Sequence, residues 1–125
     1  MTKISMAESR ILDVLWRAEK PMAVEEIAEV LSAREAGWTE GTVRTLITRL
    51  KKKKAVTATK EVRRLFYRPL MDRAAFLRAE SASLVDRLFD GQIGSFVTHF
   101  TEDRELSKAQ IAELQALIDR LAHDE

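Results

Sequence analysis

The sequence predicts a mainly α-helical protein with one small β-hairpin. Three observations carry this prediction. Apolar residues recur at helical spacing in three segments before position 51, β-forming residues follow between positions 55 and 67, and helical spacing returns after position 72. The order helix, helix, helix, hairpin within about 70 residues is typical of a winged helix-turn-helix domain. We therefore expect such a domain, followed by a C-terminal helical domain.

The first two helices are marked by their ends. Ser5 and Glu8 have the spacing of a capping box, so we expect a helix to begin there and to stop before Pro21. A second helix is expected over residues 24–32, followed by a loop over 33–38. The inward side chains of these two helices are expected to be Ile11, Leu12, Leu15, Trp16, Ile27, Ala28 and Leu31.

The third helix is expected to begin after Thr39, a plausible N-cap residue. Its apolar residues keep the i, i+3, i+4, i+7 spacing of one buried stripe. A run of four lysines, 51–54, then suits the negative C-terminal end of a helix. The buried stripe is expected to consist of Val43, Leu46, Ile47 and Leu50.

A β-hairpin is expected to follow this helix. Residues 55–59 and 65–67 are β-formers, the charged stretch 60–64 lies between them, and Pro69 ends the pattern. No Asn-Gly or similar dipeptide marks the tip, so the position of the turn stays open. The hairpin is therefore expected to be a wing with a basic tip.

Three helical segments are expected after the hairpin. Asp72 can cap a helix running to about residue 89, which Asp90-Gly91 interrupts. A short helix over 93–100 follows, and Ser107 with Gln110 forms a second capping box before the last helix. These segments total only about 50 residues, too few for a robust core of their own. We therefore expect the domain 72–125 to form a homodimer through Phe76, Leu84, Leu88, Phe96, Phe100, Ile111, Leu114, Ile118 and Leu121, and the domain 1–71 to act beside it.

The charge of the chain is divided between these two parts. The net charge is +1, yet residues 1–70 carry 15 Lys and Arg against 9 Asp and Glu, a net +6. Residues 71–125 carry 6 against 11, a net −5. A basic half joined to an acidic half indicates a polyanion-binding domain joined to another unit.

The outward side of the third helix carries residue types that read DNA. Opposite the buried stripe stand short hydroxyl residues and long cations without a carboxylate. Threonine can meet a thymine methyl or a base-edge group, and arginine can bond guanine or hold a phosphate. Between Thr39 and Arg68 there are ten Lys and Arg residues against two acids. We expect contacts with double-stranded DNA from Arg44, Thr45, Thr48, Arg49, Lys52 and Lys53, and from Arg63 and Arg64 of the wing.

The segment from Trp38 to Leu50, WTEGTVRTLITRL, followed by lysines and by Tyr67-Arg68-Pro69, resembles the penicillinase-repressor family of the BlaI/MecI type. Ile11 to Trp16, Phe89-Asp90-Gly91 and Leu106-Ser107 match in the same order, so the resemblance covers nearly the whole chain. It implies a dimeric, sequence-specific repressor of transcription on a dyad-symmetric operator. By position, it places Thr39, Thr42, Arg44, Thr45 and Arg49 at DNA contacts, and Arg63 at the wing arginine.

The sequence departs from the family pattern at three positions. Lys54 and Val62 stand where the family has glycine, which leaves the geometry of these two turns open. His99-Phe100 replaces the Asn-Phe bond that is cut when members are inactivated through a membrane sensor and protease pathway. Relief of repression by proteolysis at His99 and Phe100 is thus implied by the resemblance but left open by the substitution.

Other functions are less well supported by the residues. A winged helix used only for protein–protein contact is the alternative, but it favours an apolar or acidic outward face. No phosphate loop, Ser/His/Asp arrangement or ligand cluster indicates an enzyme, a metal or a cofactor. The chain has no cysteine, which excludes cysteine-based metal sites, including those of the copper-sensing relatives. No apolar stretch has the length of a signal peptide or membrane span, so we expect no membrane insertion and a cytoplasmic location.

Overall fold

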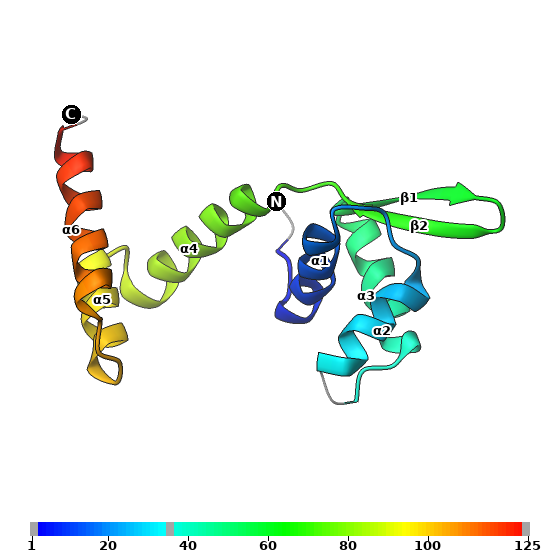
Figure 1. Cartoon of the computed structure of the whole chain (residues 1–125), viewed down its shortest axis with the longest axis horizontal. Coiled ribbons are helices and arrows are strands. Elements are labelled where there is room, and N and C mark those ends of the chain that lie inside the picture. Colours follow the sequence, from blue (N-terminus) through cyan, green and yellow to red (C-terminus); the bar gives the residue numbers. More distant parts are fainter. Residues whose placement is uncertain (1–2, 35–36, 124–125) are drawn as a thin grey trace. The chain divides into compact units, whose positions relative to one another are not determined.

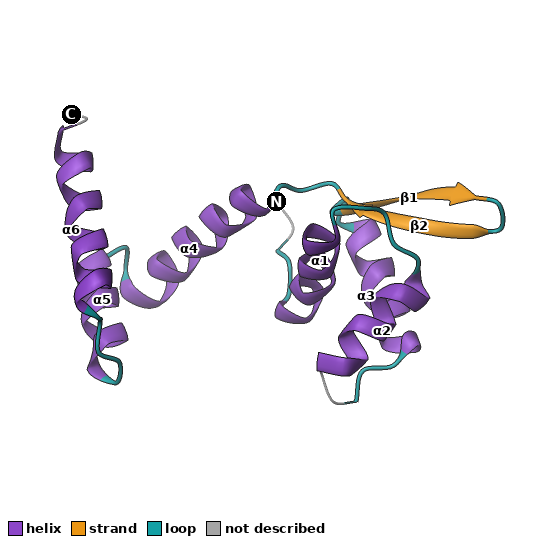
Figure 2. Cartoon of the chain, in the orientation of Figure 1, coloured by secondary structure: helices purple, strands orange, loops and turns teal. Residues whose placement is uncertain are grey.

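A computed structural model describes residues 3–34 and 37–123 of the chain (Figure 1). Helices and one antiparallel hairpin make up its regular structure (Figure 2), which confirms the predicted fold class. The chain forms two compact units, Met1–Leu77 and Arg78–Glu125, so a division between residues 71 and 72 stays a prediction. The elements are α1 (Met6–Ala18), α2 (Val24–Arg34), α3 (Glu40–Lys52), β1 (Val56–Glu61), β2 (Arg64–Pro69), α4 (Arg73–Phe89), α5 (Ile93–Glu102) and α6 (Lys108–His123).

The first unit packs α1, α2 and α3 around one apolar core. The predicted capping box at the start of α1 is present: the Ser5 hydroxyl accepts from the Glu8 amide at 3.1 Å, and the Glu8 carboxylate accepts from the Ser5 amide at 2.8 Å. Thr39 caps α3 with one bond, its hydroxyl accepting from the Thr42 amide at 3.2 Å. The core includes Ile11, Leu12, Leu15, Ile27, Leu31, Val43, Leu46, Ile47 and Leu50.

The hairpin is attached to the helical core at its base. Met22 donates to the Tyr67 carbonyl at 2.9 Å and accepts from the Tyr67 amide at 2.7 Å, which adds a short bridge beside β2. Tyr67 is itself buried in the core. Away from this base the strands project into solvent with mostly exposed side chains. The wing therefore has a fixed root and an exposed tip.

Lys54 and Val62, which stand where the family has glycine, both adopt a backbone conformation that favours glycine. Lys54 has φ 60° at the end of the third helix, and Val62 has φ 56° at the wing tip. Glu61 pairs with Arg64, so Val62 and Arg63 form a two-residue turn. A type II′ turn has a positive φ at its first central residue, and glycine is the usual residue there. The two turns therefore keep a glycine-like geometry, and a β-branched side chain is strained there.

Replacing Val62 by glycine is expected to stabilise the protein by about 1 kcal/mol. A positive φ costs a non-glycine residue about 1–2 kcal/mol, and part of the relief is lost because glycine gives the unfolded chain more freedom. The Val62 side chain is 96% exposed, so its removal sacrifices no packing. Urea unfolding of Val62→Gly and of the control Val62→Ala measures the effect. An equal stability for the glycine and alanine variants would show that this turn is unstrained.

The second unit contains α5, α6 and most of α4. None of the side chains of α4, α5 and α6 is buried. Phe89 packs edge-on against Phe96 at 5.5 Å between ring centres, and Phe96 lies 6.0 Å from Phe100. The predicted second capping box is present, with Ser107 and Gln110 exchanging hydrogen bonds of 2.8 and 3.1 Å. No helix of the described residues has the length and apolarity needed to cross a membrane.

Candidate DNA-binding interface

One side of α3 is buried and the opposite side is open. The four apolar residues of the predicted stripe are all buried, between 0 and 5% exposed. The wall formed by α1 and α2 therefore fixes the rotation of α3 about its own axis. The exposed side chains of its outward face are Thr42, Arg44, Thr45, Thr48, Arg49, Lys51 and Lys52.

Two threonines on this face, Thr45 and Thr48, use their hydroxyl protons inside the helix. The Thr45 hydroxyl donates to the Gly41 carbonyl at 3.0 Å, and the Thr48 hydroxyl donates to the Arg44 carbonyl at 3.0 Å. Threonine in a helix commonly bonds the preceding turn in this manner. These two hydroxyl oxygens can then only accept a further hydrogen bond, and the γ-methyl groups are available for apolar contact. These groups suit an exocyclic amine of adenine or cytosine, or a thymine methyl.

The predicted arginines of this face differ in their surroundings. The Arg44 guanidinium pairs with Glu40, one turn earlier, at 2.8 Å, and both side chains are exposed. Such an exposed pair contributes little stability but gives the guanidinium a preferred direction. The Arg49 side chain has no hydrogen-bond or ion-pair partner within the described residues. Among the described residues, Arg49 is thus a cation with its full donor set available.

Lys53 is distinct among the four consecutive lysines. Its ammonium pairs with the Glu8 carboxylate and also donates to the Lys3 carbonyl at 2.7 Å. The Glu8 side chain is 1% exposed and that of Lys53 is 21% exposed. Burial raises the pKa of Glu8, but hydrogen bonds from Lys53 and from the Ser5 backbone outweigh it, so this pKa lies below its usual 4.5. The structure therefore gives Lys53 a partner in the core, and its predicted DNA contact stays a prediction.

The wing carries the two predicted arginines at and beside its tip. Arg63 is exposed in the turn, whereas Arg64 pairs with Glu25 of α2 at 3.0 Å and lies 5.5 Å above the centre of the Phe66 ring. The hydrogen bond from Arg64 lowers the pKa of Glu25 below its usual value. Arg64 thus has a partner at the start of α2, through a pair exposed on both sides, whereas Arg63 is exposed at the tip.

The predicted dimerisation residues fall into two groups. Phe76 packs against Trp16 of the first unit at 5.5 Å between ring centres, and so already has a partner within the chain. The rest belong to the second unit, where most are exposed. The exposed fractions are 64% for Leu88, 45% for Phe100, 54% for Ile111, 42% for Leu114, 57% for Ile118 and 57% for Leu121, whereas Leu84 and Phe96 are half-buried.

Sequence reasoning missed Glu8 as part of this region. Its capping-box spacing was recognisable, but its ion pair joins residues 45 positions apart. The lysine run offered no signal that one of its members turns inward. Within residues 3–34 and 37–123, no group of three or more His, Cys, Asp or Glu side chains could hold a metal ion. The site therefore rests on the cations and threonines described above.

This fold and this exposed basic helix define the class of winged helix-turn-helix proteins that bind DNA. The family model described as "Penicillinase repressor" matches residues 4–120, so the chain belongs to the penicillinase repressor family.

Individual relatives agree with that assignment. The penicillinase repressor of Bacillus licheniformis is 31% identical over 117 residues, covering 94% of this chain and 90% of the relative. The methicillin resistance regulatory protein MecI of Mammaliicoccus sciuri is 29% identical over 118 residues, covering 94% of each chain. The solved DNA-binding domain of the repressor BlaI is 32% identical with a TM-score of 0.50, covering 59% of this chain and 92% of that domain.

Proposed function

We propose that the chain represses transcription as a homodimer on a dyad-symmetric DNA operator, with α3 as the reading helix and the wing as a phosphate grip. That it is a DNA-binding transcriptional repressor follows from its membership of the penicillinase repressor family. The dimer, the contact residues and the mode of relief are the proposal. Such a repressor acts on the chromosome, so we place it in the cytoplasm.

One observation carries the assignment of α3. Its buried stripe is complete, so rotation of the helix is fixed and the threonine and cation face is turned to solvent. We assign base contacts to Thr42, Arg44, Thr45, Thr48 and Arg49 of that face. Phosphate contacts are assigned to Thr39 at the helix N-terminus, to Lys52, and to Arg63 and Arg64 of the wing.

The exposed apolar side chains of the second unit support a homodimer. A unit of three helices with none of its side chains buried cannot gain much from burial alone. Exposed large apolar side chains in this number are typical of an interaction site. A two-fold partner would cover it and place two copies of α3 in successive major grooves, about 34 Å apart.

Relief by cleavage at the bond between His99 and Phe100 is also proposed. The bond lies inside α5, and the His99 ring bonds the Ser95 carbonyl one turn earlier at 2.9 Å. Cleavage there separates α6, with its exposed apolar residues, from the DNA-binding unit. A membrane sensor pathway that delivers this cut would therefore lower the amount of dimer. Mass spectrometry of the protein recovered from induced cells tests the position of the cut.

Replacing Arg49 by methionine tests the DNA interface. A duplex is first selected from random DNA by the unaltered chain, and affinities are then measured at several salt concentrations. Loss of one arginine contact is expected to lower affinity about 10-fold or more, and to reduce the slope of log affinity against log salt by about 1 if the contact is to phosphate.

The control Arg17→Met removes the same charge from an exposed pair on α1, away from this face. It is expected to leave both quantities unchanged. Failure to select any duplex, or equal effects from both variants, would favour a protein–protein interaction module instead.

A further inference from the structure

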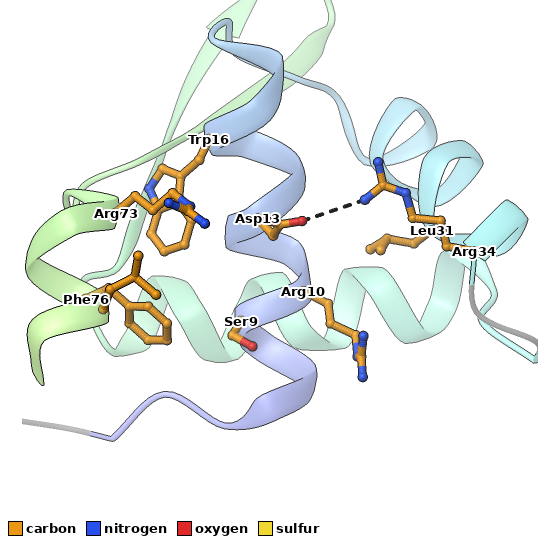
Figure 3. Close-up of a pocket in the computed structure, with 9 residues that line it drawn as sticks. Ser9, Arg10, Asp13, Trp16, Leu31, Arg34, Arg73 and Phe76 are labelled. Atoms are coloured by element: carbon orange, nitrogen blue, oxygen red, sulfur yellow. Dashed lines mark ion pairs between the residues drawn. The ribbon is translucent and has the colours of Figure 1, made fainter. Parts of the chain in front are cut away.

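A hollow in the first unit is not used by the proposed DNA contacts. It lies where α1, the end of α2 and the start of α4 meet, and its volume is about 260 Å³ (Figure 3). Every lining residue belongs to the compact unit Met1–Leu77. The residues on which its chemistry depends are Asp13, Trp16, Arg34, Arg73 and Phe76.

One wall of this hollow is aromatic. Trp16 and Phe76 lie 5.5 Å apart between ring centres, tilted by 47°, and neither is fully buried. The Trp16 indole N–H donates to the Met71 carbonyl at 2.9 Å, which fixes the ring and satisfies its donor. Buried Leu31 adds apolar surface. The wall therefore offers apolar ring surface with no unmet polar group on its indole.

The rest of the lining is cationic. Among the described lining residues, Arg34 and Arg73 carry positive charge and Asp13 carries a carboxylate. That carboxylate is shared, because Arg17 lies 3.0 Å and Arg34 3.7 Å from it. Arg73 lines the same hollow as Trp16 and Phe76, and Figure 3 draws the three on the same side of α1. An anion is thus favoured next to the rings, where a guanidinium can bond a carboxylate with two parallel hydrogen bonds.

We propose that this hollow binds a small aromatic carboxylate, a single ring bearing one carboxylate group. The ring packs on Trp16 and Phe76, and the carboxylate pairs with Arg73. Size permits a ligand of this class, since a cavity of about 150 Å³ holds benzene and the hollow, at about 260 Å³, is larger. The binding does not depend on DNA.

Benzoate is the probe for the test, and Trp16 is its reporter. The chain has two tryptophans, so Trp38→Phe leaves the fluorescence of Trp16 alone. Benzoate is expected to change the Trp16 fluorescence until it saturates, with a dissociation constant of about 1 mM or lower. Benzyl alcohol, which lacks the charge, and acetate, which lacks the ring, are expected to bind at least 10-fold more weakly. Ligand-observed NMR on the unaltered chain gives the same comparison without the Trp38 substitution.

Variants locate the binding. Arg73→Met is expected to weaken benzoate binding about 10-fold or more, because a charge-assisted hydrogen bond is lost. Arg78→Met removes an exposed arginine from the same helix, outside the lining, and is expected to change nothing. Circular dichroism checks that each variant is folded. Absence of saturation up to about 10 mM benzoate, or equal binding by Arg73→Met and Arg78→Met, overturns the proposal.

Discussion

Ile118→Glu is expected to dissociate the homodimer and with it the tight binding of a dyad operator. Ile118 is 57% exposed on α6, in line with Leu114 and Leu121 at helical spacing. A carboxylate at this position would be buried against the partner without a counter-charge, which is strongly unfavourable. The two DNA-binding units would then bind independently, and linkage of two sites typically contributes about 10²–10⁴-fold in affinity. A loss of that size is expected on the full operator.

Ala116→Glu is the matched control for this substitution. At about 100° per residue, position 116 lies on the side of α6 opposite Ile118, and it is exposed. Sedimentation measures the oligomeric state, and binding to full-length and half-site duplexes separates dimer loss from damage to α3. Half-site affinity is expected to be unchanged in Ile118→Glu. Dimers that survive this substitution, with full operator affinity, would place the interface elsewhere on the chain.

The fold was predictable because its signals are local. Two helix starts are marked by capping boxes, whose hydrogen bonds join residues three positions apart. Both boxes are present, Ser5 with Glu8 and Ser107 with Gln110. The buried stripe of α3 follows from spacing alone. Helix ends were less certain: α2 continues to Arg34, two residues beyond the predicted Ser32, because no proline or glycine stops it there.

The candidate site was predictable only in part. Spacing identified which residues of α3 face outward, because the buried stripe leaves one side free. Spacing could not reveal where each long side chain ends. Arg64 meets Glu25 across 39 positions, and Lys53 meets Glu8 across 45. The positive φ of Lys54 and Val62 was likewise hidden, because neither residue type favours that conformation.

Lys52→Met is expected to change DNA binding and Lys53→Met to change stability, although the two lysines are neighbours. Lys52 is exposed, without an ion-pair partner among the described residues, so its loss should reduce the salt slope of operator binding by about 1 and leave stability nearly unchanged. Lys53 neutralises the buried Glu8 carboxylate. Its loss should cost about 2–3 kcal/mol of unfolding free energy, below the range for fully buried pairs because Lys53 is partly exposed.

Salt titrations and urea unfolding of the same two proteins measure both effects. The salt slope of Lys53→Met is expected to equal that of the unaltered chain, because its ammonium is already engaged with Glu8. A slope reduced equally by both substitutions would place Lys53 on the DNA after all.

The same ion pair predicts how acid acts on the protein. The pKa of Glu8 is lower in the folded protein than its usual 4.5, so its stabilising effect is fully present above that pH and is lost as the pH falls below it. Protonated Glu8 no longer attracts the Lys53 ammonium. The stability difference between the unaltered chain and Lys53→Met is therefore expected to shrink as the pH falls from 7 towards 3. A difference that stays constant from pH 7 to pH 3 would mean that Lys53 stabilises the fold by packing rather than by charge.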